Sequence, residues 1–325
     1  MTEAAAVVIT HNSEDVIGAC LDSLRGQAAE IVVVDNASSD GTLGEVLRRP
    51  GISLIANPWN RGYAAAANQG IQATAAEFAL LFNPDAELVC GLDALVEECR
   101  EPDVAVCGGT LLGPDGCPQH GFMVRRLPTP ATLVFEILGI NRLWPGNPVN
   151  RRYRCLDLDL NPVADVEQPA GAFFLIRRSA WRQLGGLDES FHPLWFEDVD
   201  FCKRARQNGY RIRFVAAARA AHRGAHSARQ LSPSSREGYW YGNLLTYAAK
   251  HFHRLSFAVV CVAVVLGSIL RTIVGFFRWR SPNSVLAYGR IIRKAGSLLI
   301  AGRKRTPGLA LTVPRPSGST QSGSC

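Results

Sequence analysis

The chain has 325 residues, of which 47% are hydrophobic and 19% charged, and its net charge is +7. This composition predicts a globular fold with a real core, and the length fits one large α/β domain with an appendage. Lys and Arg outnumber carboxylates most clearly after residue 200, which favours phosphate-bearing ligands or an anionic membrane surface. We exclude nucleic acid as the weaker alternative, because the sequence carries no zinc-finger or RNA-binding pattern.

Nine Cys are scattered along the chain without a Cys-x-x-Cys pair, which argues against a zinc ribbon or a redox pair. We expect these thiols to be reduced and mostly buried, as in a cytosolic protein. The first ten residues carry an apolar run with no basic segment before it. This pattern predicts a first strand rather than a signal peptide.

Buried strands and helices alternate through the first part of the chain. Apolar runs predict strands at 4–10, 30–34, 52–56 and 77–82, and helical spacing predicts helices at 13–24, 43–48 and 68–75. This rhythm predicts an open, mostly parallel, Rossmann-like sheet with helices on both faces. Polar clusters follow several of these strands, where ligands bind in such sheets.

The second part of the chain is less regular. Residues 113–168 are rich in Pro, Gly and Arg and predict an insertion with a helix near 132–138. The sheet is expected to resume at 172–176 and to end with a strand at 211–215, with helices at 181–185 and 199–208 between them.

The most apolar segment is 255–277, whose uninterrupted part, 256–270, is shorter than the roughly 20 residues of a spanning helix. Basic residues flank it on both sides. We therefore predict a helical region at 251–302 that associates with the membrane surface, with a spanning helix or a buried core helix as alternatives. The tail at 303–325 is expected to be disordered.

Two polar clusters are candidates for ligand binding. The loop 35–42 is dense in side-chain acceptors, with an ordinary turn that caps a helix as the alternative. Asn83-Pro84-Asp85 follows an apolar strand, and a carboxylate there suits a hard divalent cation. A simple proline turn is the alternative for this tripeptide.

Glu197-Asp198-Val199-Asp200 is the most specific cluster, because three acids lie beside an aromatic stretch at a predicted helix start. The helix dipole accounts for some acidity there, but a general base for a sugar hydroxyl would also be a carboxylate in a partly dehydrated pocket. His222 follows the last predicted strand and is a candidate metal ligand, with His226 as a competitor.

Together these segments resemble glycosyltransferase family 2, in particular its rhamnosyltransferase-like branch. The matching stretches are 7–12, 33–42, 60–70, 82–85, 169–178, 185–191 and 197–204, which cover residues 5 to about 227 in order.

The resemblance implies a GT-A fold at 1–250, with a nucleotide-binding half at about 1–112 and an acceptor half at about 113–250, and an inverting displacement. It assigns Asp198 as the base with Glu197 as its acidic neighbour, and Asp85 and His222 to a divalent cation, Mg²⁺ or Mn²⁺. The residues that it assigns to the nucleotide-sugar site are Thr10, Asn12, Asp35, Asn36, Asp40, Asn60, Gly62, Asn68 and Asn83.

The same resemblance suggests dTDP-rhamnose as the donor, with UDP-sugars next. We expect a saccharide or lipid-linked saccharide acceptor in cell-wall or surface polysaccharide synthesis, and a cytoplasmic enzyme peripheral on the inner face of the cell membrane. Self-association into a homo-oligomer stays open. The alternatives are a polyprenyl-phosphate glycosyltransferase, a non-catalytic sugar-nucleotide scaffold, and another nucleotide enzyme on a similar sheet, although the first βα turn lacks a dinucleotide-binding glycine pattern.

Overall fold

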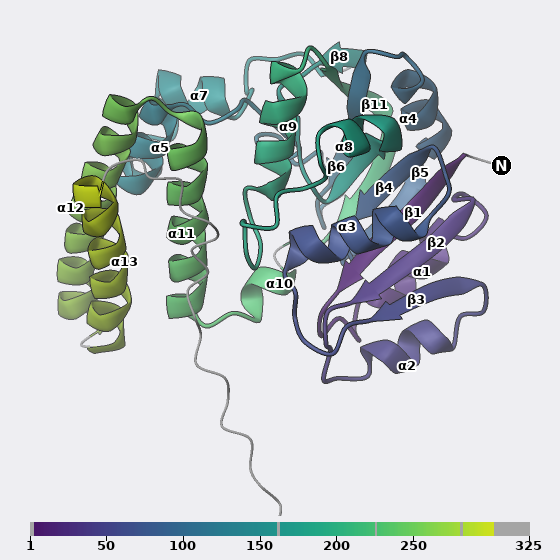
Figure 1. Ribbon diagram of the computed structural model, residues 1–325, viewed down its shortest axis with the longest axis horizontal. Helices are drawn as coiled ribbons and strands as arrows, with labels where there is room; N and C mark the ends of the chain where they lie inside the picture. The colour runs from purple at the N-terminus through teal and green to yellow at the C-terminus, as the bar shows by residue number, and fades with distance from the viewer. Residues whose placement is uncertain (1–2, 161–162, 225, 280–281, 302–325) are drawn as a thin grey trace, which may run out of the picture.

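The structure is a computed structural model that describes residues 3–160, 163–224, 226–279 and 282–301 (Figure 1). The strands are β1 (Ala4–Thr10), β2 (Glu30–Asp35), β3 (Ile52–Ala56), β4 (Phe78–Phe82), β5 (Ala86–Cys90), β6 (Val104–Leu112), β7 (Val124–Arg125), β8 (Val163–Asp165), β9 (Gln168–Pro169), β10 (Phe173–Arg177) and β11 (Arg211–His222). The helices are α1 (Ile17–Leu24), α2 (Thr42–Leu47), α3 (Tyr63–Ala73), α4 (Leu92–Cys99), α5 (Pro130–Ile137), α6 (Ile140–Leu143), α7 (Pro148–Tyr153), α8 (Arg178–Gln183), α9 (Glu197–Gln207), α10 (His226–Arg229), α11 (Pro233–His251), α12 (Arg254–Trp279) and α13 (Pro282–Ala301).

A nine-stranded sheet forms the centre of the molecule in the order β3-β2-β1-β4-β10-β6-β11-β5, with β8 beside β11. Strands β3, β2, β1 and β4 are parallel. Because β10 is antiparallel to both β4 and β6, and β11 is parallel to β6, the strands β6 and β11 run in the same direction as β4. The sheet is therefore mostly parallel and flanked by helices, as the sequence predicts, and the carboxyl ends of β1, β2, β4 and β11 share one edge.

The local sequence explains the first strands well. Strand β1 and strand β4 are buried along their whole length, which accounts for their unbroken apolar runs. The last predicted strand, 211–215, is too short, because β11 continues to His222 after an irregularity between Val215 and Arg219. Polar and small residues in its second half hide the strand from a hydrophobicity pattern.

The insertion contains the predicted helix as α5, followed by α6 and α7. Thr129 and Asn147 cap α5 and α7, each followed by a Pro in the first turn. Helix α5 packs against α7 and against α12 of the C-terminal region, so the insertion joins the two parts of the molecule. Figure 1 shows α5, α7, α11, α12 and α13 gathered on one side of the sheet.

Helix α12 is longer than the apolar run in the sequence suggests. Within the described residues one stretch, Arg254–Val274, is long and apolar enough to cross a membrane by length and composition, and 39% of its most apolar window is buried. Helix α12 continues through Arg271, where the apolar run of the sequence stops. The Arg271 guanidinium donates to the carbonyl oxygens of Ile137 and Gly267. The expected disordered tail at 303–325 lies outside the described residues.

Candidate active site

Asp85 and His222 meet because β11 and β5 pair as antiparallel strands with His222 opposite Ala86. This register brings His222 Nε2 to 3.6 Å from Asp85 Oδ1, and both side chains are buried. Asn83 precedes them in the turn, where its N–H donates to the carbonyl oxygen of Ala172 at 3.2 Å. The two residues assigned to a cation from the sequence therefore lie side by side at the ligand edge of the sheet.

The imidazole ring of His222 is held in one orientation. Gln119 Nε2 donates to the His222 carbonyl at 2.9 Å, Gln119 Oε1 lies 3.1 Å from His222 Nδ1, and the Phe122 ring stacks on the imidazole at 5.5 Å. Burial lowers the pKa of His222, and the carboxylate of Asp85 opposes this effect. A neutral ring that donates its Nδ1 proton to Gln119 carries its lone pair on Nε2, toward Asp85.

This pair fits a divalent cation. His222 Nε2 is buried and has no hydrogen-bond partner among the described residues, although a carboxylate oxygen faces it. Two electron-pair donors that face each other without a shared proton are stabilised by a metal ion between them. The described residues contain no group of three or more His, Cys, Asp or Glu that could hold a metal, so most positions on a cation would fall to phosphate oxygens and water.

The ends of β1 and β2 are joined by a polar hydrogen-bond network. The Asn12 N–H donates to Ser38 Oγ at 2.8 Å, and Asn12 Oδ1 accepts from the Ser39 N–H at 2.8 Å. Asp35 Oδ2 accepts from the Ser38 N–H at 2.9 Å. Thr10 is buried at the end of β1, and its hydroxyl has no partner among the described residues. The edge is thus preformed by its own hydrogen bonds.

Asp40 closes the same loop from its far end. Its carboxylate accepts from the N–H groups of Thr42 at 3.1 Å and Glu14 at 3.2 Å, so it caps the entry to α2 and holds the 13–15 turn. These two hydrogen bonds are the kind expected for an ordinary turn before a helix, which is the alternative given for the loop 35–42. A nucleotide contact by Asp40 therefore stays a proposal.

Asn36 lies beneath the loop that leads into α3. Its Oδ1 accepts from Asn57 Nδ2 at 3.1 Å and its Nδ2 donates to the Gly62 carbonyl at 3.1 Å. Asn60 Oδ1 accepts from the Gly62 N–H at 2.9 Å. Gly62 has a φ of 84°, and a Cβ at this position would lie 2.5 Å from His192 Nδ1. These residues shape the loop tightly against the segment before Glu197.

Asn68 ties α3 to the loop that precedes the acidic cluster. Its Oδ1 accepts from Trp181 Nε1 at 3.0 Å and from the Leu187 N–H at 2.9 Å. Its Nδ2 donates to the Leu187 carbonyl at 2.9 Å and to Glu189 Oε1 at 3.1 Å. Each polar atom of this amide already has two partners, so any effect of Asn68 on a ligand would pass through the loop that it holds.

Asp198 is half-buried at the start of α9. Its Oδ2 accepts from Gln168 Nε2 at 3.2 Å and from the Gly171 N–H at 3.1 Å, which fixes the carboxylate over the loop before β10. Burial raises the pKa of Asp198, against the hydrogen bonds that favour the charged form. The preceding residues Trp195 and Phe196 both have positive φ values, of 77° and 75°. Such strain in bulky residues is typical of functional sites.

Glu197 differs from its neighbour. Its side chain is buried, and its Oε2 has no hydrogen-bond partner among the described residues. Burial raises the pKa of Glu197 well above its ordinary value, and the nearby charge of Asp198 adds to this effect. Two adjacent carboxyl groups in one partly dry pocket favour a single negative charge between them.

Asp200 is enclosed by basic side chains. It is fully buried, and Arg204 Nε, Lys250 Nζ and His251 Nε2 each lie 2.7 Å from one of its oxygens. Arg204 also donates to the carbonyls of Leu184 and Gly186. This cluster joins α9 to α11 and to the loop that Asn68 holds.

Sequence reasoning missed the residues that support the site from the insertion. Gln119 and Gln168 bind His222 and Asp198, and Arg125 lies opposite Gln168 in the β7–β9 pair. No local pattern marks them, because each acts on a residue that is distant in sequence. The one indication in the sequence is the density of Arg from 125 to 154, which is typical of a segment that binds an anion.

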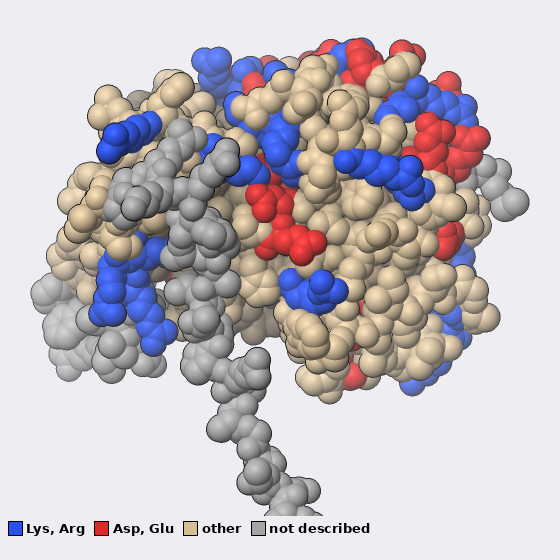
Figure 2. Space-filling view, viewed as in Figure 1, with Lys and Arg blue, Asp and Glu red and all other residues tan. Residues whose placement is uncertain are grey.

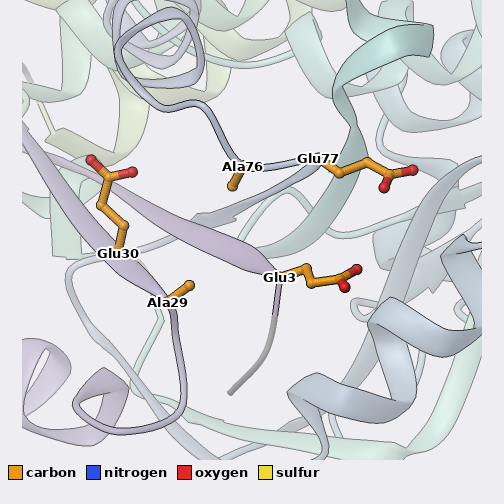
Figure 3. A pocket seen from close by; sticks show the side chains of 5 residues that line it. All are labelled: Glu3, Ala29, Glu30, Ala76 and Glu77. Atoms are coloured by element: carbon orange, nitrogen blue, oxygen red, sulfur yellow. The ribbon is translucent and has the colours of Figure 1, made fainter.

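Two hollows lie on the surface, one far from these residues and one beside Asn68 and the Asp200 cluster. The first, of about 480 Å³, is lined by Glu3, Ala29, Glu30, Ala76 and Glu77 (Figure 3). It lies at the opposite, amino-terminal edge of β1, β2 and β4, and its glutamates pair with Arg100, Thr74 and Arg177.

The second hollow, of about 390 Å³, lies between the 184–189 loop and Lys250 of α11. Figure 2 shows acidic side chains gathered near the middle of this face of the molecule, with basic ones above and below them.

Comparison with known proteins identifies the family of the chain. The model of glycosyl transferase family 2 matches residues 5–184. The chain is 30% identical over 226 residues to the N-acetylglucosaminyl-diphospho-decaprenol L-rhamnosyltransferase of Mycobacterium tuberculosis, which covers 64% of this chain and 71% of the relative. It is 28% identical over 217 residues to the low-salt glycan biosynthesis hexosyltransferase Agl10 of Haloferax volcanii, covering 65% of this chain and 64% of that protein.

Among solved structures, GalNAc-T7 with UDP, GalNAc and Mn²⁺ superposes with a TM-score of 0.53 at 16% identity. The match covers 76% of this chain and half of that one, at 50%. The fold expected from the sequence, GT-A, is thereby confirmed. By its sequence, the chain belongs to glycosyl transferase family 2.

Proposed function

We propose that the chain transfers a sugar from a nucleoside diphosphate sugar to a hydroxyl of a saccharide or lipid-linked saccharide, with inversion at the anomeric carbon. The observation that supports this proposal is that the loop at 171–172 contacts both the candidate base and the turn that precedes Asp85. Asp198 Oδ2 accepts from the N–H of Gly171, and the next residue, Ala172, accepts from Asn83 beside Asp85. An acceptor hydroxyl and a leaving diphosphate can therefore be held on two sides of one reacting carbon.

Asp198 removes the proton of the acceptor hydroxyl as the sugar is transferred. Its two oxygens are fixed by Gln168, Gly171 and Val199, and its raised pKa makes it a stronger base than a solvated carboxylate. Glu197 is the electrostatic partner of this base. Its buried carboxyl has a raised pKa, and this limits the negative charge that the pocket must hold.

Asp85 and His222 are the residues that would hold Mg²⁺ or Mn²⁺. Such a cation, when bound, would neutralise charge on the leaving diphosphate. Gln119 contributes by fixing the His222 ring with Nε2 toward Asp85. Thr10, Asn12, Asp35, Asp40 and Asn83 are the proposed nucleotide contacts at this edge, although the Thr10 hydroxyl is buried. Asn36, Asn60, Gly62 and Asn68 would act through the loops that they hold.

Rhamnose from dTDP-rhamnose is the proposed donor sugar, with UDP-sugars next. Its support is the rhamnosyltransferase of Mycobacterium tuberculosis at 30% identity, whose name also describes a diphospho-decaprenol acceptor. A lipid-linked acceptor agrees with the C-terminal helices. Helix α12 exposes a stripe of apolar side chains at helical spacing on the side away from its partners, and they are Leu255, Val259, Val262, Leu266, Ile269 and Ile273. We propose that this stripe lies on the inner face of the cell membrane during cell-wall or surface polysaccharide synthesis.

The test is a panel of nucleotide sugars with saccharide and lipid-linked acceptors, followed by mass analysis of the products. We expect dTDP-rhamnose to be consumed in preference to UDP-sugars, with one deoxyhexose added to the acceptor. EDTA should abolish transfer, and added Mn²⁺ or Mg²⁺ should restore it. A chain that binds donors but transfers and hydrolyses none is a scaffold, and full activity in EDTA would remove the cation from the proposal.

A further inference from the structure

Two arginines of the insertion share one carbonyl oxygen. Arg125 Nε donates to the Gly121 carbonyl at 3.0 Å, and Arg154 Nη1 donates to the same atom at 3.4 Å. Both side chains are half-buried. Gly121 allows this approach, since its φ is 75° and a Cβ there would lie 3.2 Å from Arg154 Cβ. The fold therefore brings two guanidinium groups close together.

Among the described residues no carboxylate forms an ion pair with these two arginines, and Asp198 acts on Arg125 only through its more distant charge. Within the part of the chain that the structure describes, neither Arg125 nor Arg154 has an ion pair, whereas the neighbouring Arg126 and Arg151 pair with Glu167 and Asp157. Like charges at this separation repel each other, and partial burial reduces their screening. A doubly charged anion would relieve the repulsion, and the planar guanidinium matches phosphate oxygens in geometry.

Aromatic rings hold Arg125 in position. Its guanidinium carbon lies 5.5 Å from the centroid of Phe122 and 5.8 Å from that of Tyr153. Its one described hydrogen bond uses Nε, so the terminal nitrogens can contact a ligand. A cation fixed between rings loses little freedom when it binds an anion, which favours recognition.

The arginine pair borders the reacting residues. Phe122, on one side of Arg125, stacks on His222. Arg125 is the register partner of Gln168, whose side chain binds Asp198. The pair is therefore separated from the Asp85–His222 position by Phe122, and it lies on the side of the base, where the acceptor must enter.

The pair also borders the helical region. Arg154 follows α7 directly, α7 packs on α5, and α5 packs on α12 with its exposed apolar stripe. These contacts connect α12 to the arginines, and Gln168 connects Arg125 to Asp198. A lipid-linked acceptor has its lipid chain, diphosphate and sugar in the same order as α12, the arginine pair and Asp198.

We propose that Arg125 and Arg154 form a subsite for the diphosphate of a lipid-diphosphate-linked saccharide acceptor. The inference rests on the proposed transfer to a lipid-linked saccharide. It adds that the two arginines select this acceptor by its diphosphate. The diphosphate could in principle be that of the donor or that of the acceptor. Position favours the acceptor, and the experiment separates the two sources.

The experiment compares two acceptors that differ only in the anionic linker, an N-acetylglucosaminyl diphosphate with a short prenyl chain and an N-acetylglucosaminyl octyl glycoside. The full-length chain and its R125Q, R154Q and double variants are assayed for KM with each acceptor and with the donor. Loss of one charge-assisted hydrogen bond typically costs about tenfold or more. We expect the KM for the diphosphate acceptor to rise about tenfold in each single variant and further in the double variant. The KM values for the octyl glycoside and the donor should change less than about twofold.

The matched control is R126Q, which removes the same charge one residue along the chain from an exposed ion pair with Glu167. It should leave both acceptor KM values unchanged. Equal losses with both acceptors would overturn the subsite, because Arg125 would then act only through Asp198, whose charge it favours. A rise in donor KM alone would assign the pair to the donor diphosphate.

A binding measurement keeps the inference testable without turnover. Geranyl diphosphate should bind the wild-type chain, in titration calorimetry, about tenfold more tightly than the double variant, while both melt at the same temperature. If the wild type transfers no sugar yet shows this difference, the proposed function fails and the diphosphate subsite stands. If transfer occurs and geranyl diphosphate binds both chains equally, the subsite fails alone.

Discussion

The three acids at the start of α9 have three different surroundings, although they lie within four residues. Asp198 is held by donors and borders the ligand edge, Glu197 is buried without a partner for one oxygen, and Asp200 is enclosed by cations. The sequence shows three acids, and the family resemblance gives a role to Asp198 and Glu197 alone. Only the structure supplies the reasons, because the partners of these acids come from segments far away in the chain.

Asp198→Asn should fold normally and lose at least about 100-fold in turnover, since an amide cannot take the acceptor proton. Burial raises the pKa of Asp198 above 3.8, and a base works only when deprotonated. The turnover of the wild-type chain should therefore fall as pH is lowered through this raised pKa. A pH profile with circular dichroism of the variant checks both points. Near-normal turnover in the variant would instead favour a phosphate acceptor, which needs no base.

Asp200→Asn should destabilise the fold by roughly 3–5 kcal/mol, because it leaves buried cations without their counter-charge. The pKa of Asp200 is lowered to about 2, since His251, Arg204 and Lys250 outweigh the cost of burial. A depressed pKa contributes stability above the unfolded value near 4, and about 2 kcal/mol of it is lost as pH falls from about 4 to about 2.

Urea denaturation across this pH range measures the effect of Asp200→Asn. Asp165→Asn is the control, because its carboxylate is 59% exposed and pairs with Arg211 and Arg213 at the surface. That change should cost less than about 1 kcal/mol. Equal stability losses in both variants would show that the Asp200 cluster is no stronger than a surface ion pair.

At the scale of the elements, the pattern of residues predicts β1 to β4 to within a residue or two at each end. Burial gives β1, β4 and most of β2 nearly unbroken apolar runs, whereas β3 is partly exposed. The same pattern gives neither the antiparallel direction of β10 nor the extension of β11 to His222. Both depend on pairing between strands that are distant in the chain. The candidate residues could be chosen by resemblance, but their supports Gln119 and Gln168 could not.

Gly62→Ala should distort the loop before α3. Gly62 has φ 84° and ψ 161°, a conformation almost restricted to glycine, and a Cβ would also lie 2.5 Å from His192 Nδ1. We expect a loss of roughly 2–4 kcal/mol and a raised donor KM. Gly51→Ala is a matched control, since its φ is 83° but no atom lies within 4 Å of the added carbon.

The control should lose only the backbone cost, about 1–2 kcal/mol. Chemical denaturation and donor titration separate the two variants. If Gly62→Ala and Gly51→Ala give the same stability and the same donor affinity, the contact with His192 does not shape the loop before α3.

At the scale of the whole molecule, the C-terminal helices are joined to the catalytic domain through α5 and through the Asp200 cluster. Helix α12 buries one side against α5, α11 and α13 and exposes its apolar stripe on the other. Sequence hydropathy could find this helix, but only its packing separates the covered side from the free side.

The double variant V262E/L266E should weaken binding to vesicles that contain phosphatidylglycerol by at least about 30-fold. The two side chains are 47% and 54% exposed, and burying such groups is worth about 1.5–3 kcal/mol each. Vesicle co-sedimentation measures the loss. Leu47→Glu changes an equally apolar side chain, 72% exposed on α2, and should have no effect. Unaltered co-sedimentation of the double variant would remove the stripe from the membrane contact.

The cations around Asp200 have a consequence for modularity. Lys250 and His251 stand at the last turn of α11, yet they neutralise an acid two residues from Asp198. A chimera that joins residues 1–249 to a foreign segment would leave that acid facing Arg204 alone, and the start of α9 would loosen. The useful fusion point therefore lies after His251, because α11 supplies two of the three cations around Asp200.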